Sequence, residues 1–204
     1  MTSRPVETLA QRKRQLVADE LTQAALGLLA RGGFDAVTVD EIAAAAGVSK
    51  RTFFRYFASK EDVVVQFLTG LGAAMREELA SRPASEPPST ALRHTVWRSI
   101  DACAGQTERT LRVVQLILDT PALLARFLER QAQWREELAA VVAERLGLDP
   151  ATELYPRLAA GMALTAFHTV LQQWSESDGT EDPAALTDGC FAVIAPALDA
   201  VAGE

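Results

Sequence analysis

Residues 38–61 read TVDEIAAAAGVSKRTFFRYFASKE, and this stretch decides the fold of the N-terminal part of the chain. Thr38 and Glu41 have the spacing of a capping box, which predicts that a helix begins directly after Thr38. Gly47 follows about two helical turns later and ends this helix. Ser49 then caps a second short helix. Two short helices joined at a glycine predict a helix-turn-helix motif.

The second helix of this motif, which as a whole spans about residues 38–57, has an apolar face and a cationic face. Phe53 and Phe57 are four residues apart and are therefore expected to point into the core. The exposed side carries arginine, threonine and tyrosine, which contact phosphates and base edges when such a helix enters the major groove. An ordinary amphipathic helix with solvated cations would show the same pattern, but the capped helix before it and Lys60 after it favour DNA binding.

Hydrophobic periodicity predicts helices along the rest of the chain, and no segment alternates as a strand would. Residues 81–90 are rich in serine and proline and form the clearest loop. Pro196 is expected to kink or end the last helix. The sequence thus predicts an all-α fold of about nine helices, of which the other seven cover about residues 11–30, 59–79, 91–104, 108–119, 121–146, 150–177 and 183–202.

The composition is that of an ordinary soluble globular protein, with 49% hydrophobic and 23% charged residues among 204. No apolar stretch is long enough to cross a bilayer, and residues 1–14 lack the apolar segment of a secretory signal. We therefore expect a cytoplasmic protein with no membrane partner. Cys103 and Cys190 are spaced neither as a disulfide framework nor as a metal site, which favours two free thiols.

The charge is unevenly distributed along the chain. Residues 1–60 carry nine basic and six acidic side chains, a net charge of +3, so the rest of the chain carries −10 of the total of −7. A cationic head on an anionic body would present one end to phosphate. Arg12, Lys13 and Arg14 either contact flanking phosphates or simply form a solvated helix start.

The order and spacing of several short segments resemble the TetR family of bacterial repressors. These segments are TVDEIA at 38–43, AGVS at 46–49, TFFRYF at 52–57 and SKE at 59–61, within a match that covers about residues 15–75. The resemblance implies a three-helix DNA-binding head, a variable helical ligand domain and a homodimer on a palindromic operator. It also implies that ligand binding moves the two heads out of register.

The resemblance also implies roles for individual residues. Residues 50–52 open the recognition helix, Tyr56 lies where family members often place a phosphate-binding histidine or tyrosine, and Lys60 lies where the family's lysine holds backbone phosphate. Phe54 departs from the family, which usually has tyrosine there, and so lacks a hydroxyl group for a phosphate hydrogen bond. The candidate DNA-binding residues are Thr38, Ser49, Lys50, Arg51, Thr52, Phe54, Arg55, Tyr56 and Lys60.

The predicted domains are residues 1–76, which bind DNA, and residues 77–204, which bind a ligand and dimerise. Aromatic side chains spread over different helices of the second domain either line one apolar cavity or fill the core. Neither histidine has a second metal ligand at helical spacing, so no metal or cofactor is expected. The candidate ligand-binding residues are Arg93, Trp97, Phe127, Arg130, Trp134, Phe167 and His168.

The second domain also resembles a TetR branch with acyl-CoA-like ligands, including mycofactocin-type regulators. Residues 119–134, residues 145–150 and Trp174 carry this resemblance, which implies a largely apolar ligand. Two stripes of small or apolar residues would suit dimerisation, although both could equally pack within one subunit. They comprise Ala159, Ala163, Ala166 and Val170, and then Leu186, Cys190, Val193 and Ala197.

The predicted function is that of a transcriptional regulator, a repressor that a small, largely apolar ligand releases from double-stranded DNA. The alternative is a helical small-molecule-binding protein whose DNA head is not functional. The sequence has no nucleophile elbow, phosphate loop or HExxH motif, so no enzymatic activity is expected.

Overall fold

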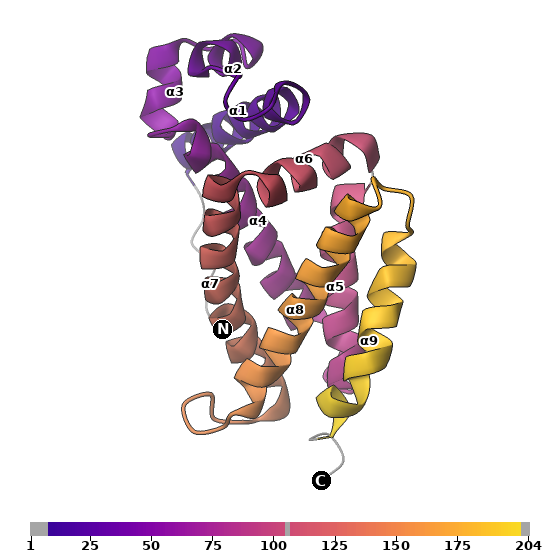
Figure 1. Ribbon diagram of the computed structural model, residues 1–204. Helices are drawn as coiled ribbons and strands as arrows, with labels where there is room; N and C mark the ends of the chain where they lie inside the picture. Colours follow the sequence, from indigo (N-terminus) through magenta and orange to yellow (C-terminus); the bar gives the residue numbers. More distant parts are fainter. Residues whose placement is uncertain (1–7, 105–106, 201–204) are drawn as a thin grey trace. The chain divides into compact units, whose positions relative to one another are not determined.

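The structure is a computed structural model that describes residues 8–104 and 107–200. Within these residues the chain forms nine α-helices and no strand, which confirms the predicted all-α class (Figure 1). In chain order the helices are α1 (Leu9–Gly32), α2 (Val39–Ala45), α3 (Lys50–Tyr56), α4 (Lys60–Ser81), α5 (Pro88–Ala104), α6 (Thr107–Asp119), α7 (Pro121–Leu146), α8 (Tyr155–Glu176) and α9 (Pro183–Asp199).

The chain divides into two compact units, and the division falls within α4, between Phe67 and Leu68. We call the N-terminal unit the head and the C-terminal unit the body. The domain boundary expected after residue 76 falls within the same helix. One continuous helix therefore belongs to both units.

In the head, side-chain caps begin each of the first three helices. Thr8 and Gln11 form a capping box at the start of α1, and Thr38 and Glu41 form the predicted one at the start of α2. The Ser49 side chain accepts a hydrogen bond from a backbone N–H of α3, as predicted. The caps satisfy backbone N–H groups that the first turn of a helix leaves without partners, and this helps to stabilise α2 and α3 although each has only seven residues.

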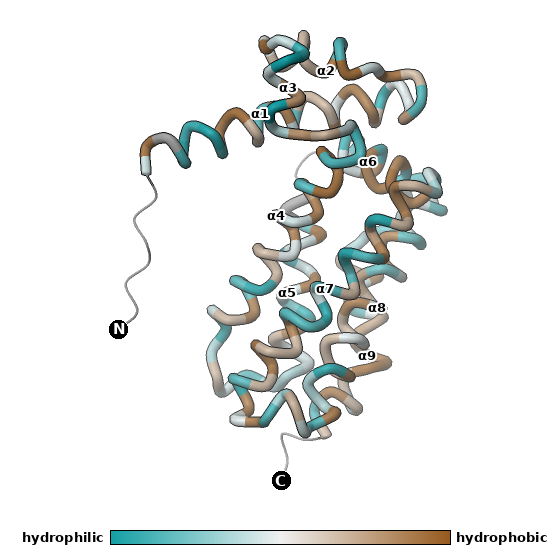
Figure 2. Tube along the Cα trace, turned by 90° about the vertical axis from the view of Figure 1, so that its left-hand side faces the viewer, coloured by the Kyte–Doolittle hydropathy of each residue, from teal (hydrophilic) through white to brown (hydrophobic). Residues whose placement is uncertain are grey.

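In the body, α7 and α8 pack along each other, and α9 packs against α5 and α8. Apolar positions recur between polar ones along these helices (Figure 2), which is the pattern of helices with one face in a core. The largest fully buried side chains of the body include Trp134, Trp174, Phe127 and Phe167. Among the helices of the described residues, none is long and apolar enough to cross a membrane.

Two helix starts in the body differ from the sequence prediction. α5 begins at Pro88, three residues before the predicted start. Proline is tolerated there because a backbone N–H in the first turn of a helix has no partner within the helix. α8 begins only at Tyr155, because the carbonyl of Asp149 accepts hydrogen bonds from a separate turn that ends at Glu153. Pro196 lies inside α9 and does not end it.

The two apolar stripes of α8 and α9 behave differently. Ala159, Ala163, Ala166 and Val170 are buried within the single chain, so the α8 stripe packs inside the subunit. On α9, by contrast, Leu186 and Cys190 are half-buried, Ala197 is exposed, and Val193 is 79% exposed.

Cys190 is a free thiol, whereas the side chain of Cys103 lies outside the described part.

Candidate functional site

The recognition helix α3 presents a buried face and an exposed face. Phe53 is fully buried and Phe57 nearly so, as predicted, and their rings lie 5.6 Å apart. The Phe54 ring stands edge-on to Phe53 at 5.5 Å but is 49% exposed. Phe54 is therefore both a packing residue and part of the outer surface of α3.

The cations at the start of α3 differ in their surroundings. Lys50 Nζ lies 2.8 Å from a carboxylate oxygen of Asp40, and this exposed ion pair joins α3 to α2. An ion pair this exposed contributes little to stability. Arg51 is exposed, and no partner for its guanidinium occurs within residues 8–104 and 107–200. Arg51 is thus free to reach a base edge or a phosphate.

Tyr56 forms a cluster with two arginines at the other end of α3. The guanidinium of Arg55 lies 5.3 Å from the centre of the Tyr56 ring, and that of Arg14 on α1 lies 6.0 Å from it. These are cation–π distances, so the ring helps to hold both guanidiniums. The cluster combines a phenol group with two positive charges, which suits a phosphate oxygen.

The hydroxyl groups among the candidates serve the caps. Thr38 Oγ1 donates to a carboxylate oxygen of Glu41 at 2.8 Å, and the hydrogen bonds from the backbone and side chain of Thr38 lower the pKa of Glu41. Ser49 Oγ lies 3.0 Å from Thr52 Oγ1 and accepts from the Thr52 backbone at 3.1 Å. In the head as it stands, these groups fix the starts of α2 and α3.

Lys60 points back into the head. Its ammonium group donates to the backbone carbonyls of Phe34 and Val37, and lies 4.3 Å from the centre of the Phe34 ring. The sequence did not show these contacts, because they join residues 23 and 26 positions apart.

In the body, four of the seven ligand candidates form one aromatic cluster between α7 and α8. Phe127 lies 6.0 Å from Trp134, 6.4 Å from Phe167 and 5.3 Å from His168, measured between ring centres. The first three side chains are at most 2% exposed, so they pack against one another as a core. Burial lowers the pKa of His168, which keeps its imidazole neutral at pH 7.

The other three candidates lie elsewhere in the body. Arg93 on α5 pairs with Asp188 on α9. Trp97 is half-buried on α5. Arg130 on α7 donates to Gln133 and to Thr69 of α4.

Sequence reasoning missed Gly72 and Gln131. A Cβ atom at Gly72 would lie 1.9 Å from Trp134 Nε1, so glycine is what lets α4 approach the indole. A groove of about 390 Å³ between α7 and α8 is lined by Gln131 and His168. Nε2 of each is buried and finds no hydrogen-bond partner within the described residues. Neither residue stands in a recognisable motif, so no sequence pattern pointed to them.

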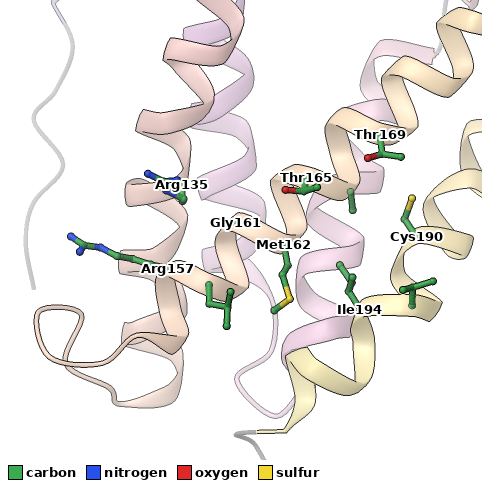
Figure 3. A pocket seen from close by; sticks show the side chains of 11 residues that line it. Arg135, Arg157, Gly161, Met162, Thr165, Thr169, Cys190 and Ile194 are labelled. Atoms are coloured by element: carbon green, nitrogen blue, oxygen red, sulfur yellow. The ribbon is translucent and has the colours of Figure 1, made fainter.

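A second, more apolar groove of about 560 Å³ is lined by residues of α8 and α9 and by Arg135 of α7 (Figure 3). Arg135 and Arg157 lie together at one end of it, and Cys190 and Ile194 lie at the other. Glu136 pairs with both arginines, at 3.6 and 3.0 Å. Together with Val193, this groove forms an apolar face on the outside of the body.

Comparison with known families matches both units. Residues 21–67 match the family described as bacterial regulatory proteins of the tetR family, and residues 86–199 match the MftR C-terminal domain. The chain belongs to the TetR family of transcriptional regulators. As a TetR-family member it is a DNA-binding regulator with a helix-turn-helix head and a helical ligand-binding body.

Individual TetR-family relatives agree with this assignment. The HTH-type transcriptional regulator TcmR of Streptomyces glaucescens is 34% identical over 172 residues, which cover 81% of this chain and 76% of TcmR. MftR of Mycobacterium tuberculosis, a candidate mycofactocin biosynthesis transcriptional regulator, is 32% identical over 96% of this chain and 98% of its own length. The crystal structure of the regulator FadR from Bacillus subtilis in complex with stearoyl-CoA shares the fold, with 20% identity and a TM-score of 0.64 over 87% of this chain and 97% of FadR.

Proposed function

We propose that this chain is a repressor that binds a palindromic operator as a homodimer and leaves it when a small, largely apolar effector binds to the body. The observation that carries the proposal is the surface of α3, where cationic side chains are exposed above the buried Phe53 and Phe57. Such a helix enters the major groove with its N-terminus first. A regulator of this kind acts in the cytoplasm, where the DNA is.

The exposed residues on and around α3 make different contacts with DNA. Arg51, which is free of partners among the described residues, is placed to read a base edge, as arginine does at guanine. Arg14, Arg55 and Tyr56 form a phosphate-binding cluster. Lys50 exchanges its exposed pair with Asp40 for a phosphate. Apart from Lys60, the remaining candidates border the same surface; they are Thr38, Ser49, Thr52 and Phe54.

Dimerisation through the α8–α9 face supports binding to a palindrome. Val193 and Leu158 are large apolar side chains exposed at this face, and a second copy would cover them. Residues 189–198 of α9 carry no charge, so burying them against a partner has no cost of charge desolvation. A two-fold dimer then offers two copies of α3 to two half-sites.

The effector is proposed to enter the body between α7 and α8 and to repack the aromatic cluster there. An apolar ligand suits Phe127, Trp134 and Phe167, and an oxygen atom on it would satisfy the unpartnered nitrogens of Gln131 and His168. The stearoyl-CoA in the FadR structure supports an acyl-CoA-like molecule.

The test is selection of fragmented genomic DNA from the encoding organism by the purified protein, followed by sequencing. Recovery of a few palindromic intergenic sites supports the proposed repressor, and stearoyl-CoA, with free coenzyme A as control, then tests release. Failure to enrich any site with folded, dimeric protein favours the alternative, a helical small-molecule-binding protein with a non-functional head.

A further inference from the structure

We propose that Lys60 is a positioning residue that fixes the helix-turn-helix from behind, and that its main role is not to hold DNA phosphate. This inference rests on the proposed function, since it concerns how the head is kept ready for DNA. It assigns Lys60 a task different from the one that the family resemblance implies.

The first observation is where the ammonium group of Lys60 lies. It donates to two backbone carbonyls, those of Phe34 and Val37, with Nζ 3.3 Å from the Val37 oxygen. The Phe34 ring lies 4.3 Å away and adds a cation–π contact. An ammonium group has three N–H donors, so two are already used inside the head. These charge-assisted hydrogen bonds are stronger than neutral ones.

The second observation is what these carbonyls belong to. Residues 33–37 link α1 to α2, and Val37 directly precedes the N-cap of α2. Val37 is buried, and a Cβ atom at Gly32 would lie 2.8 Å from its side chain, so the link is closely packed on the end of α1. Lys60 therefore ties down the backbone at the place where α2 starts.

The third observation is that this tie extends to the recognition helix. α2 and α3 pack against each other, and the backbone N–H of Val48, just before α3, donates to the carbonyl of Ala43 in α2 at 2.9 Å. Fixing the start of α2 thus also helps to orient the start of α3. Lys60 is the first residue of α4, so this single side chain joins the helix that both units share to the segment that sets α2.

The test measures DNA affinity against salt concentration for three variants. The first two, Lys60→Met and Phe34→Leu, both disturb the tie, but Phe34→Leu changes no charge. The third, Arg55→Met, removes a proposed phosphate contact and is the control. The DNA probes are a 30-base-pair duplex with the selected operator and a scrambled duplex of equal length. A lost phosphate contact lowers the slope of log affinity against log salt by about 0.9.

We expect Lys60→Met to weaken operator binding by about tenfold, equivalent to about 1.4 kcal/mol, and Phe34→Leu to weaken it by a smaller factor, with the salt slope unchanged in both. The double variant should lose little more than Lys60→Met alone, because the Phe34 ring acts through its contact with the Lys60 ammonium group. Backbone amides of residues 38–42 should exchange hydrogen faster in both single variants without DNA. Arg55→Met should lower the slope and leave this exchange as in the parent protein.

The proposal is overturned if Lys60→Met lowers the salt slope as Arg55→Met does while Phe34→Leu leaves affinity and exchange unchanged. Should Lys60→Met fail to fold, Phe34→Leu carries the same test alone. If the parent protein binds no operator, the proposed function fails. The exchange measurement on free protein then still decides whether Lys60 holds the start of α2.

Discussion

The head and the body use aromatic side chains in opposite ways. On α3, Phe53 is buried while Phe54 and Tyr56 on the same helix stay accessible, so the helix has a functional outer face. In the body, Phe127 and Trp134 are almost completely buried and contact each other edge to face. A surface site follows from helical spacing alone, whereas an interior site depends on which helices meet. The predictions below are ordered from the largest expected effect to the smallest.

The largest effect is expected where the body is most tightly packed. Trp134→Ala should lower the free energy of unfolding by about 4 kcal/mol, because it empties the space between α7 and the backbone of Gly72. Urea unfolding followed by circular dichroism measures it. Trp97→Ala, at a half-buried position, is the control and should cost less. Equal losses would mean that the aromatic cluster is not the centre of the core.

A functional effect without a stability effect is expected on α3. Replacing Lys50 and Arg51 together by glutamate should weaken operator binding by about 100-fold or more, because phosphate contacts become repulsive. The free energy of unfolding should change by less than about 0.5 kcal/mol, since both side chains are exposed. The same reversal at Arg112 and Arg126 of the body is the matched control. Unchanged operator binding by the α3 variant would remove α3 from the DNA surface.

A smaller effect is expected at the start of α2. Thr38→Ala should destabilise the head by about 1 kcal/mol, because it removes the acceptor for the Glu41 backbone N–H. Thermal unfolding and amide exchange in α2 measure the loss, and Thr38→Ser, which keeps the hydroxyl group, should behave as the parent. If Thr38→Ala weakened DNA binding without changing α2 exchange, Thr38 would be a direct DNA contact instead.

The smallest effect is a pH dependence from His168. Burial lowers its pKa in the folded chain, so as the pH falls below about 6.5 the unfolded chain takes up a proton first. Stability from this residue is therefore complete above that pH and is lost as the pH falls toward the folded-state pKa. His168→Gln should flatten the plot of unfolding free energy between pH 7 and 5. His94→Gln is the control. If it flattened the plot as much as His168→Gln does, the pH dependence could not be assigned to His168.

Local features of the fold were predictable because they depend on residues three or four positions apart. Thr38 and Glu41, and Ser49 with Thr52, form their caps where the sequence placed them. Helix ends that depend on turns were predicted less well. The predicted start of α8 lies five residues before the observed one. The residues after Asp149 instead form a turn with hydrogen bonds of its own.

The candidate sites were predictable to different degrees for the same reason. On α3, spacing alone separated the buried Phe53 and Phe57 from the exposed residues around them. In the body, spacing identified aromatic residues but not their partners. Arg93 and Trp97 were grouped with Phe127, yet Arg93 pairs with Asp188 on α9.

The sequence by itself determined the all-α fold, the caps of α2 and α3 and the cationic face of the recognition helix, because each follows from contacts within one or two helical turns. Only the tertiary structure decided that the alanine stripe of α8 is internal, that Trp134 packs against Gly72, and that Lys60 holds the carbonyls of Phe34 and Val37. These contacts join residues far apart in the chain, so they exist only once the helices have packed.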